Sequence, residues 1–320
     1  MSMGLGHRKV RHLAVLAAVG AAAALLPASR AHAATIVNDT WQDAERTQPA
    51  APIYSEYGTD ADTDGDIESA WFNAGTGATA TASAGHLVLA PAASSASWTT
   101  YLTPAATPVT LSNTGDALHV RWAFKTGDVN TSNTSQNFRI ALVDTVTDAT
   151  RVSTDAAPGS DLYPGYSLFG NMGETTGNGN SFQLRERLAA TNSDLLGTSG
   201  NWTALANGLG NAAVGYADNT NYQFDMTLTR NASSGLDILM TMTGGTIGGT
   251  GTVSVNFTDP TPSSFTYDTF QIRPSNSTST ATSFDTTQFL VEGPVPEPSS
   301  LALAGFAAVG LLRRARRSRN

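Results

Sequence analysis

The strongest candidate for chemistry is an acidic loop at 60–68, which reads Asp-Ala-Asp-Thr-Asp-Gly-Asp-Ile-Glu. Acidic residues at alternate positions, glycine at the sixth and an apolar residue at the eighth match the first part of a calcium loop. Carboxylates two positions apart can converge on a hard cation, and Gly65 permits the sharp turn. The sequence therefore predicts Ca²⁺ ligands at Asp60, Asp62, Asp64, Asp66 and Glu68. It indicates no other cofactor.

This loop departs from an EF-hand in two respects. Trp71 stands at the twelfth position, where the EF-hand places a bidentate Glu, and no helical periodicity flanks the loop. Two interpretations stay open: a different calcium loop that leads into a strand, or an acidic, solvated turn.

Catalytic arrangements have little support in the sequence. The absence of cysteine excludes thiolate catalysis, disulfides and cysteine-based zinc sites. Only His86 and His119 lie beyond the leader, and no Gly-x-Ser-x-Gly motif accompanies them. Glu186 lies on the apolar side of an alternating segment and is a candidate cleft acid. We expect no catalytic residues and a protein that is not an enzyme.

Tryptophans offer a second kind of site, because the faces of sugar rings are apolar. Trp122 fits the alternation of a core strand. Trp98 and Trp202 stand in more polar runs, so we predict these two as an exposed carbohydrate platform.

The first 33 residues are typical of a cleaved leader. A basic stretch at 7–12 precedes an apolar run at 13–26, which is short for a membrane-spanning helix of roughly 20 residues. Ala31 and Ala33 form a small-x-small site, so we predict that signal peptidase cuts after Ala33.

The C-terminus has three parts in order: Pro296-Glu297-Pro298, an apolar segment at 301–312 and a basic tail at 313–320 with five arginines. The prolines hold the backbone extended, and the arginines should stay cytoplasmic. This arrangement resembles the PEP-CTERM sorting signal, with the motif at 295–298 and the whole signal at 294–320. The resemblance implies processing by an exosortase and transient inner-membrane association through a C-terminal membrane helix. It also implies a Gram-negative bacterium that makes extracellular polysaccharide or biofilm.

The segment between the two ends is strongly acidic. Residues 35–295 hold nine of the 18 Lys/Arg and 25 of the 26 Asp/Glu, a formal charge of −16 against −8 for the whole chain. A nucleic-acid-binding protein needs a basic face, so we expect no nucleic-acid partner. Such a charge suits a soluble, secreted protein or one that attracts divalent cations.

Residues 34–293 show short alternating runs and no long helical periodicity, which predicts half-buried strands in one domain. About a dozen antiparallel strands without crossover helices indicate an all-β, antiparallel β-sandwich of the jelly-roll or concanavalin-like kind. Short stretches such as Glu68-Ser-Ala-Trp-Phe72 also resemble exported sandwich domains of PEP-CTERM proteins. The clearest predicted strands cover 116–126, 137–144, 181–188, 221–230 and 236–243; weaker ones cover 70–72, 86–90, 97–102, 166–169, 252–258, 270–273 and 284–291.

Three functions fit these features. The first is a non-catalytic structural or adhesive component of the exopolysaccharide or biofilm matrix, at the cell surface or outside the cell. The second is a carbohydrate-binding module, with calcium in the acidic loop and extracellular polysaccharide as partner. The third is a glycan hydrolase or lyase, which needs two carboxylates roughly 5–10 Å apart on a concave sheet face.

Overall fold

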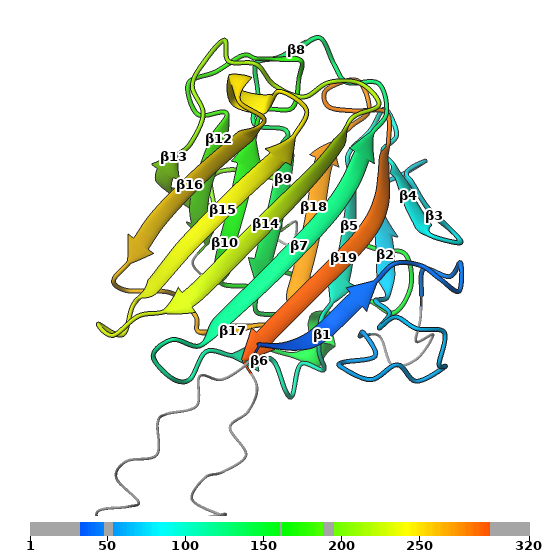
Figure 1. Cartoon of the computed structure of the whole chain (residues 1–320), viewed down its shortest axis with the longest axis vertical. Coiled ribbons are helices and arrows are strands. Elements are labelled where there is room, and N and C mark those ends of the chain that lie inside the picture. The colour runs from blue at the N-terminus through cyan, green and yellow to red at the C-terminus, as the bar shows by residue number, and fades with distance from the viewer. Residues whose placement is uncertain (1–32, 48–53, 161, 188–194, 295–320) are drawn as a thin grey trace, which may run out of the picture. The chain divides into compact units, whose positions relative to one another are not determined.

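The computed structural model describes residues 33–47, 54–160, 162–187 and 195–294 (Figure 1). The segment Ala33–Pro296 forms one compact unit. It consists of two large antiparallel sheets packed face to face, which confirms the predicted sandwich. No helix within the described ranges is long and apolar enough to cross a membrane. The predicted membrane segment at 301–312 lies outside these ranges.

The larger sheet has eight strands and lies nearer the viewer in Figure 1. Its order is β16 (Thr252–Asp259), β15 (Leu236–Gly244), β14 (Asn221–Arg230), β7 (Ala117–Thr126), β19 (Phe284–Pro294), β4 (His86–Ala90) and β3 (Thr79–Ser83). The eighth strand, β1 (Ala33–Asp39), pairs with the second half of β19, so that Ala33 lies opposite Pro294.

The smaller sheet has seven strands and lies behind the first. Its order is β13 (Trp202–Asn207), β12 (Phe182–Arg187), β10 (Gly165–Gly170), β9 (Phe138–Val143), β18 (Thr269–Ser275), β5 (Ala96–Tyr101) and β2 (Trp71–Ala74). Two short pairs complete the strands: β8 (Ser132–Asn133) with β11 (Thr175–Thr176), and β6 (Val109–Thr110) with β17 (Thr266–Tyr267). Short 3₁₀ turns cover Asp148–Thr150 and Ile247–Gly249.

The core lies between the sheets and is built from the alternate residues that the sequence pattern identifies. In β7, Leu118, Val120, Trp122 and Phe124 are buried, whereas the residues between them are partly exposed. Trp122 stacks on Phe124 with ring centroids 4.0 Å apart. Because the side-chain period of a strand is two, this burial also fixes the register against the neighbouring strands.

Each of the twelve predicted segments overlaps an observed strand, but several strands were missed. The missed strands of the two large sheets are β1, β3 and β13. β3 reads Thr-Ala-Thr-Ala-Ser and leaves every residue at least partly exposed, so it carries no strong apolar alternation. β13 buries only Trp202. These strands form because they pair with neighbouring strands, and not because their own sequences alternate between apolar and polar residues.

A buried ion pair supports the loops outside the smaller sheet. The side chains of Arg151 and Asp268 are fully buried, and Arg151 Nη2 donates to Asp268 Oδ2 at 2.7 Å. Asp268 Oδ1 also accepts a hydrogen bond from the Thr145 backbone N–H at 2.9 Å. The pair therefore links the segment after β9 to the residue before β18.

We predict that Arg151→Met lowers the free energy of unfolding by about 3–5 kcal/mol, because it leaves the Asp268 carboxylate buried without its countercharge. Arg121→Met is the matched control, since the Arg121–Asp225 pair is 32% and 21% exposed and should cost less than about 1 kcal/mol. Urea unfolding of the two variants measures both losses. Equal losses would contradict a stabilising role of the buried pair.

Candidate functional site

The acidic loop lies between β1 and β2 and is anchored to β1 by backbone and side-chain hydrogen bonds. Asn38 and Ile67 exchange backbone hydrogen bonds at 3.0 and 3.3 Å. Asp66 Oδ2 accepts hydrogen bonds from the Thr40 N–H and hydroxyl at 2.6 and 2.7 Å. The loop is therefore held at a fixed place beside the larger sheet.

A second anchor lies just after the loop. The buried Asp39 carboxylate accepts hydrogen bonds from the Ser69 N–H at 3.0 Å and from the Ser69 hydroxyl at 2.6 Å. Ser69 Oγ in turn accepts a hydrogen bond from Trp71 Nε1. Burial raises the pKa of Asp39 to about 7, although these donors oppose the shift. The chain that follows the loop is thereby fixed to the core, where the Trp71 and Phe289 ring centroids lie 5.2 Å apart.

Inside the loop the backbone turns sharply, as the sequence predicts. Gly65 has a φ of 110° and open space around the position of a Cβ atom, so its backbone conformation is what requires glycine. Asp60 Oδ1 accepts a hydrogen bond from the Thr63 N–H at 2.6 Å.

The acidic side chains converge in three overlapping groups whose ligand oxygens lie within 4.8 Å of one another. The first group, Asp60, Asp62 and Asp64, is exposed and was predicted in full. The other two groups join loop residues to more distant acids: Asp43 with Asp64 and Glu68, and Glu56 with Asp62 and Glu68.

Glu68 is the centre of this arrangement. Glu68 is 1% exposed, and neither of its carboxylate oxygens accepts a hydrogen bond from the described residues. Burial, together with the neighbouring Glu56 and Asp64 carboxylates, raises its pKa to about 10. A buried carboxylate without hydrogen bonds is costly, and further acids beside it increase the cost. A cation at this place would offset both costs.

The chemistry of the donors fits a hard cation. All are carboxylate oxygens, which Ca²⁺ prefers in sets of six to eight with flexible geometry. Glu68 would hold the ion either with Asp43 and Asp64 or with Glu56 and Asp62. Asp60 belongs to the exposed group with Asp62 and Asp64.

The structure changes the predicted set of ligands in two respects. Asp66 belongs to none of the three groups, and its Oδ2 atom accepts the hydrogen bonds from Thr40. Asp43 and Glu56 were missed, since both precede the alternating pattern. Glu56 Oε1 and Oε2 instead accept hydrogen bonds from the Ala61 and Glu68 N–H groups at 3.0 and 3.2 Å, a contact with no sequence motif.

The prediction of an exposed tryptophan platform is wrong. Trp98 is 0% exposed and Trp202 is 4% exposed. Trp98 belongs to the main core, and its Nε1 donates to the Thr79 carbonyl at 3.2 Å. Trp202 packs beside Phe169 on the outer side of the smaller sheet. Ser97 and Thr99, next to Trp98, are themselves buried, whereas Thr203, next to Trp202, is exposed. The polarity of the neighbouring residues therefore did not indicate whether the tryptophan is exposed.

The other candidates for chemistry lie in separate places. His119 lies between two carboxylates on the outer face of the larger sheet, with Nε2 2.8 Å from Asp225 and Nδ1 3.0 Å from Glu292. Glu186 is half-buried, accepts a hydrogen bond from the Ser263 N–H at 2.9 Å, and has its pKa raised by burial. The expectation that the protein is not an enzyme stays a prediction.

With this geometry in place, one comparison bears on where the protein is sent. The described body is an antiparallel β-sandwich with a candidate metal centre, and residues 294–317 match the PEP-CTERM protein-sorting motif. This match confirms the resemblance carried by Pro296, Glu297 and Pro298, although these residues lie outside the described ranges. The chain therefore carries a PEP-CTERM signal and is an exported protein targeted to the cell envelope. The predicted leader cleavage at Ala31 and Ala33 stays a prediction; of the two residues only Ala33 is described, as the first residue of β1.

The sandwich is similar in outline to several solved lectin structures. The metal-free Emp46p carbohydrate recognition domain shares 14% identity and a TM-score of 0.41, over 69% of this chain and 87% of that one. The Ca²⁺/Man3GlcNAc-bound VIP36 exoplasmic/lumenal domain shares 13% identity and a TM-score of 0.41, over 69% of this chain and 82% of that one. Lectin II from Ulex europaeus shares 7% identity and a TM-score of 0.40, over 70% of this chain and 93% of that one. The identities and scores are too low for their ligands to bear on this chain. No curated protein matches the sequence.

The position of His119 leads to a prediction about pH. The hydrogen bond to Asp225 raises the pKa of His119 above its ordinary value, so the folded state favours the imidazolium. The resulting stability is fully present below about pH 6.5 and is lost as pH rises through the higher folded pKa. We expect the free energy of unfolding to fall by up to about 1 kcal/mol over that window.

His119→Gln should make the decline between pH 5.5 and 8.5 shallower, and the raised pKa values of Asp39 and Glu68 should account for the decline that remains. His86→Gln should leave the full decline in place, because His86 is more exposed and pairs with Asp285. Urea unfolding at pH 5.5, 7 and 8.5 measures the slope, with chelator present to exclude effects of metal. An unchanged slope in His119→Gln would contradict the assignment.

Proposed function

We propose that this protein is a non-catalytic, structural or adhesive component of the cell envelope or extracellular matrix, and that Ca²⁺ locks its sandwich at the acidic loop. The observation that carries the proposal is the buried Glu68 carboxylate, without hydrogen bonds and among converging acids. The sorting motif supports a place outside the cytoplasm, where calcium sites of 10⁻⁴–10⁻³ M affinity are typically used.

The position of the site explains what the cation would do. Asp43 follows β1, whereas Asp64 and Glu68 precede β2, so one ion would connect the two sheets at this edge. In its absence the raised pKa of Glu68 favours the neutral form of that side chain, and no ion links Asp43 to Asp64 and Glu68. Calcium would therefore act on the stability of the body and not on a reaction.

The finer parts of the proposal rest on the sorting signal. Signal peptidase and exosortase would process the two ends in a Gram-negative bacterium, with brief attachment to the inner membrane through the C-terminal segment. Extracellular polysaccharide would be the matrix partner. The strongly negative charge of residues 35–295 supports a protein that stays soluble among other polymers and recruits divalent cations.

The first experiment is calcium titration of residues 33–296, which form one compact unit. Because the ion binds the folded state, we expect heat of binding and a saturable rise in melting temperature. At a hundredfold excess over Kd the stabilisation is about 2.7 kcal/mol, or roughly 5–10 °C for a body of this size. The absence of both heat and shift would contradict the proposed calcium function.

Glu68→Gln tests the central carboxylate directly. We expect this variant to lose the calcium-dependent rise in melting temperature. In chelator at neutral pH it should melt close to the temperature of the unmodified protein, because the raised pKa keeps Glu68 neutral there and Gln has a similar size. Asp128→Asn is the matched control, since Asp128 is an exposed acid outside the three groups. It should retain the full response to calcium. If calcium still raised the melting temperature of Glu68→Gln, the ion would bind at a place other than Glu68.

A further inference from the structure

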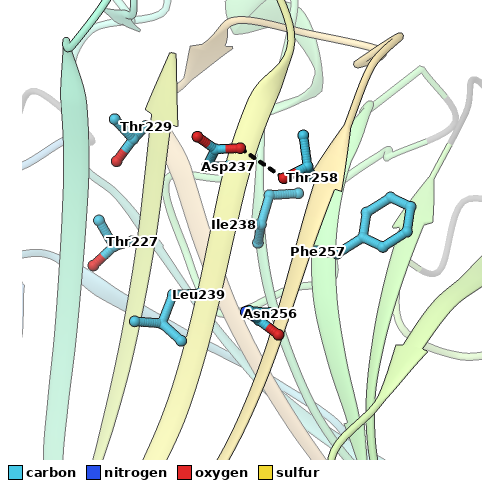
Figure 2. A pocket seen from close by; sticks show the side chains of 8 residues that line it. All are labelled: Thr227, Thr229, Asp237, Ile238, Leu239, Asn256, Phe257 and Thr258. Carbon is cyan, nitrogen blue, oxygen red and sulfur yellow. Dashed lines mark hydrogen bonds between the residues drawn. The ribbon is translucent and has the colours of Figure 1, made fainter. Parts of the chain in front are cut away.

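The outer face of the larger sheet carries a hollow that none of the features described so far uses (Figure 2). It has a volume of about 760 Å³ and extends over β14, β15 and β16. This size is within the range of about 300–1,000 Å³ that is typical of ligand pockets. The lining residues are Thr227, Thr229, Asp237, Ile238, Leu239, Asn256, Phe257 and Thr258.

The polar groups of this hollow are only partly used within the protein. Asp237 Oδ1 accepts hydrogen bonds from Thr258 Oγ1 at 2.8 Å and from Asn231 Nδ2 at 3.3 Å. Asp237 Oδ2 accepts none from the described residues, so one carboxylate oxygen is open to a ligand. The side chains of Thr227, Thr229 and Asn256 likewise have no hydrogen-bond partner within the described part of the chain.

An apolar contact lies among these polar groups. Leu239 is 47% exposed, although it lies on a central strand of the sheet. The strand register places it between Thr227 on β14 and Asn256 on β16. Figure 2 shows Leu239 and Asp237 along the same strand, with Thr227 and Thr229 on one side and Asn256 and Thr258 on the other. An exposed leucine surrounded by open donors and acceptors forms a rigid surface that is apolar at its centre and polar around it.

This combination suits a sugar chain, whose residues have apolar faces and hydroxyl edges. The hydroxyls would donate to Asp237 Oδ2, Thr227 and Thr229, while a C–H face of the ring rests on Leu239. Neighbouring strands lie about 4.8 Å apart, so the groups on three strands are spread widely enough to contact more than one sugar unit.

Charge decides which kind of polysaccharide fits. The lining contains no basic residue, and Asp237 is its only charged residue. On the same face, Arg121 and His119 are engaged with Asp225 and Glu292. A polyanion would find no countercharge in the hollow and would be repelled by a body of formal charge −16. A neutral polymer avoids this repulsion.

We propose that the hollow over β14, β15 and β16 binds a neutral polysaccharide chain. The inference deepens the proposed function, because it names the matrix partner, but it uses no residue of the acidic loop. It also replaces the tryptophan platform with a surface that the sequence did not indicate.

The test is affinity electrophoresis and calorimetry of residues 33–296 with four neutral polymers: dextran, laminarin, a soluble β-1,4-glucan and a β-1,4-mannan. Alginate serves as the polyanion and chitosan as the polycation. We expect binding to at least one neutral polymer and none to alginate. Asp237→Asn and Leu239→Ala should each weaken that binding about tenfold or more, since charge-assisted hydrogen bonds and apolar contact are lost.

Ser254→Ala is the matched control, because Ser254 is exposed on β16 two residues from Asn256 and does not line the hollow. It should bind like the unmodified protein, and circular dichroism should show that all variants are folded. Failure to bind any of the four neutral polymers, equal binding by all variants, or binding only to alginate or chitosan would overturn the proposal.

The two proposals can fail separately. A protein that gains stability with calcium but binds no neutral polymer would retain the proposed calcium function and lose the hollow as a site. A protein that binds a neutral polymer through Asp237 and Leu239, but shows no response to calcium, would retain the hollow as a binding site and lose the proposed calcium function.

Discussion

The burial of one face from each of two antiparallel sheets is the interaction on which the rest of this structure depends. The chain has no cysteine, so no disulfide can hold it together. Alternate residues of β7, β14 and β19 supply the half of the core that comes from the larger sheet, and residues of β9, β10 and β18 supply the other half. With the inner faces fixed by this burial, the outer faces and edges are free to carry charged loops and an open hollow.

The acidic loop illustrates how a stable body can tolerate an unfavourable group. Asp39 and the Oδ2 atom of Asp66 accept the hydrogen bonds that hold the loop against β1. Glu68, between these anchors and the core residue Trp71, is left without any hydrogen bond to its carboxylate. A buried acid of this kind is costly in isolation and useful beside a cation, which is why its surroundings carry the proposed function.

The pairing of β1 with β19 joins the two ends of the body. Ala33, the last residue of the predicted leader, lies opposite Pro294, the first residue of the matched sorting motif. The first and last residues of the body thus lie side by side on paired strands. The candidate calcium site and the hollow both belong to the body between these points, so the sorting motif and the proposed binding chemistry reside in separate parts of the chain.

The sequence by itself determined the sorting signal, the sandwich and the general location of the acidic site, because each depends on local order or on a period of two. Gly65 and the exposed group of Asp60, Asp62 and Asp64 could be read from spacing alone. Only the tertiary structure decided that Asp43 and Glu56 join Glu68, that Asp66 is an anchor, and that Trp98 and Trp202 are buried. It also created the hollow, which needs three strands side by side. Those features depend on contacts between distant segments, and neither residue type nor local spacing carries that information.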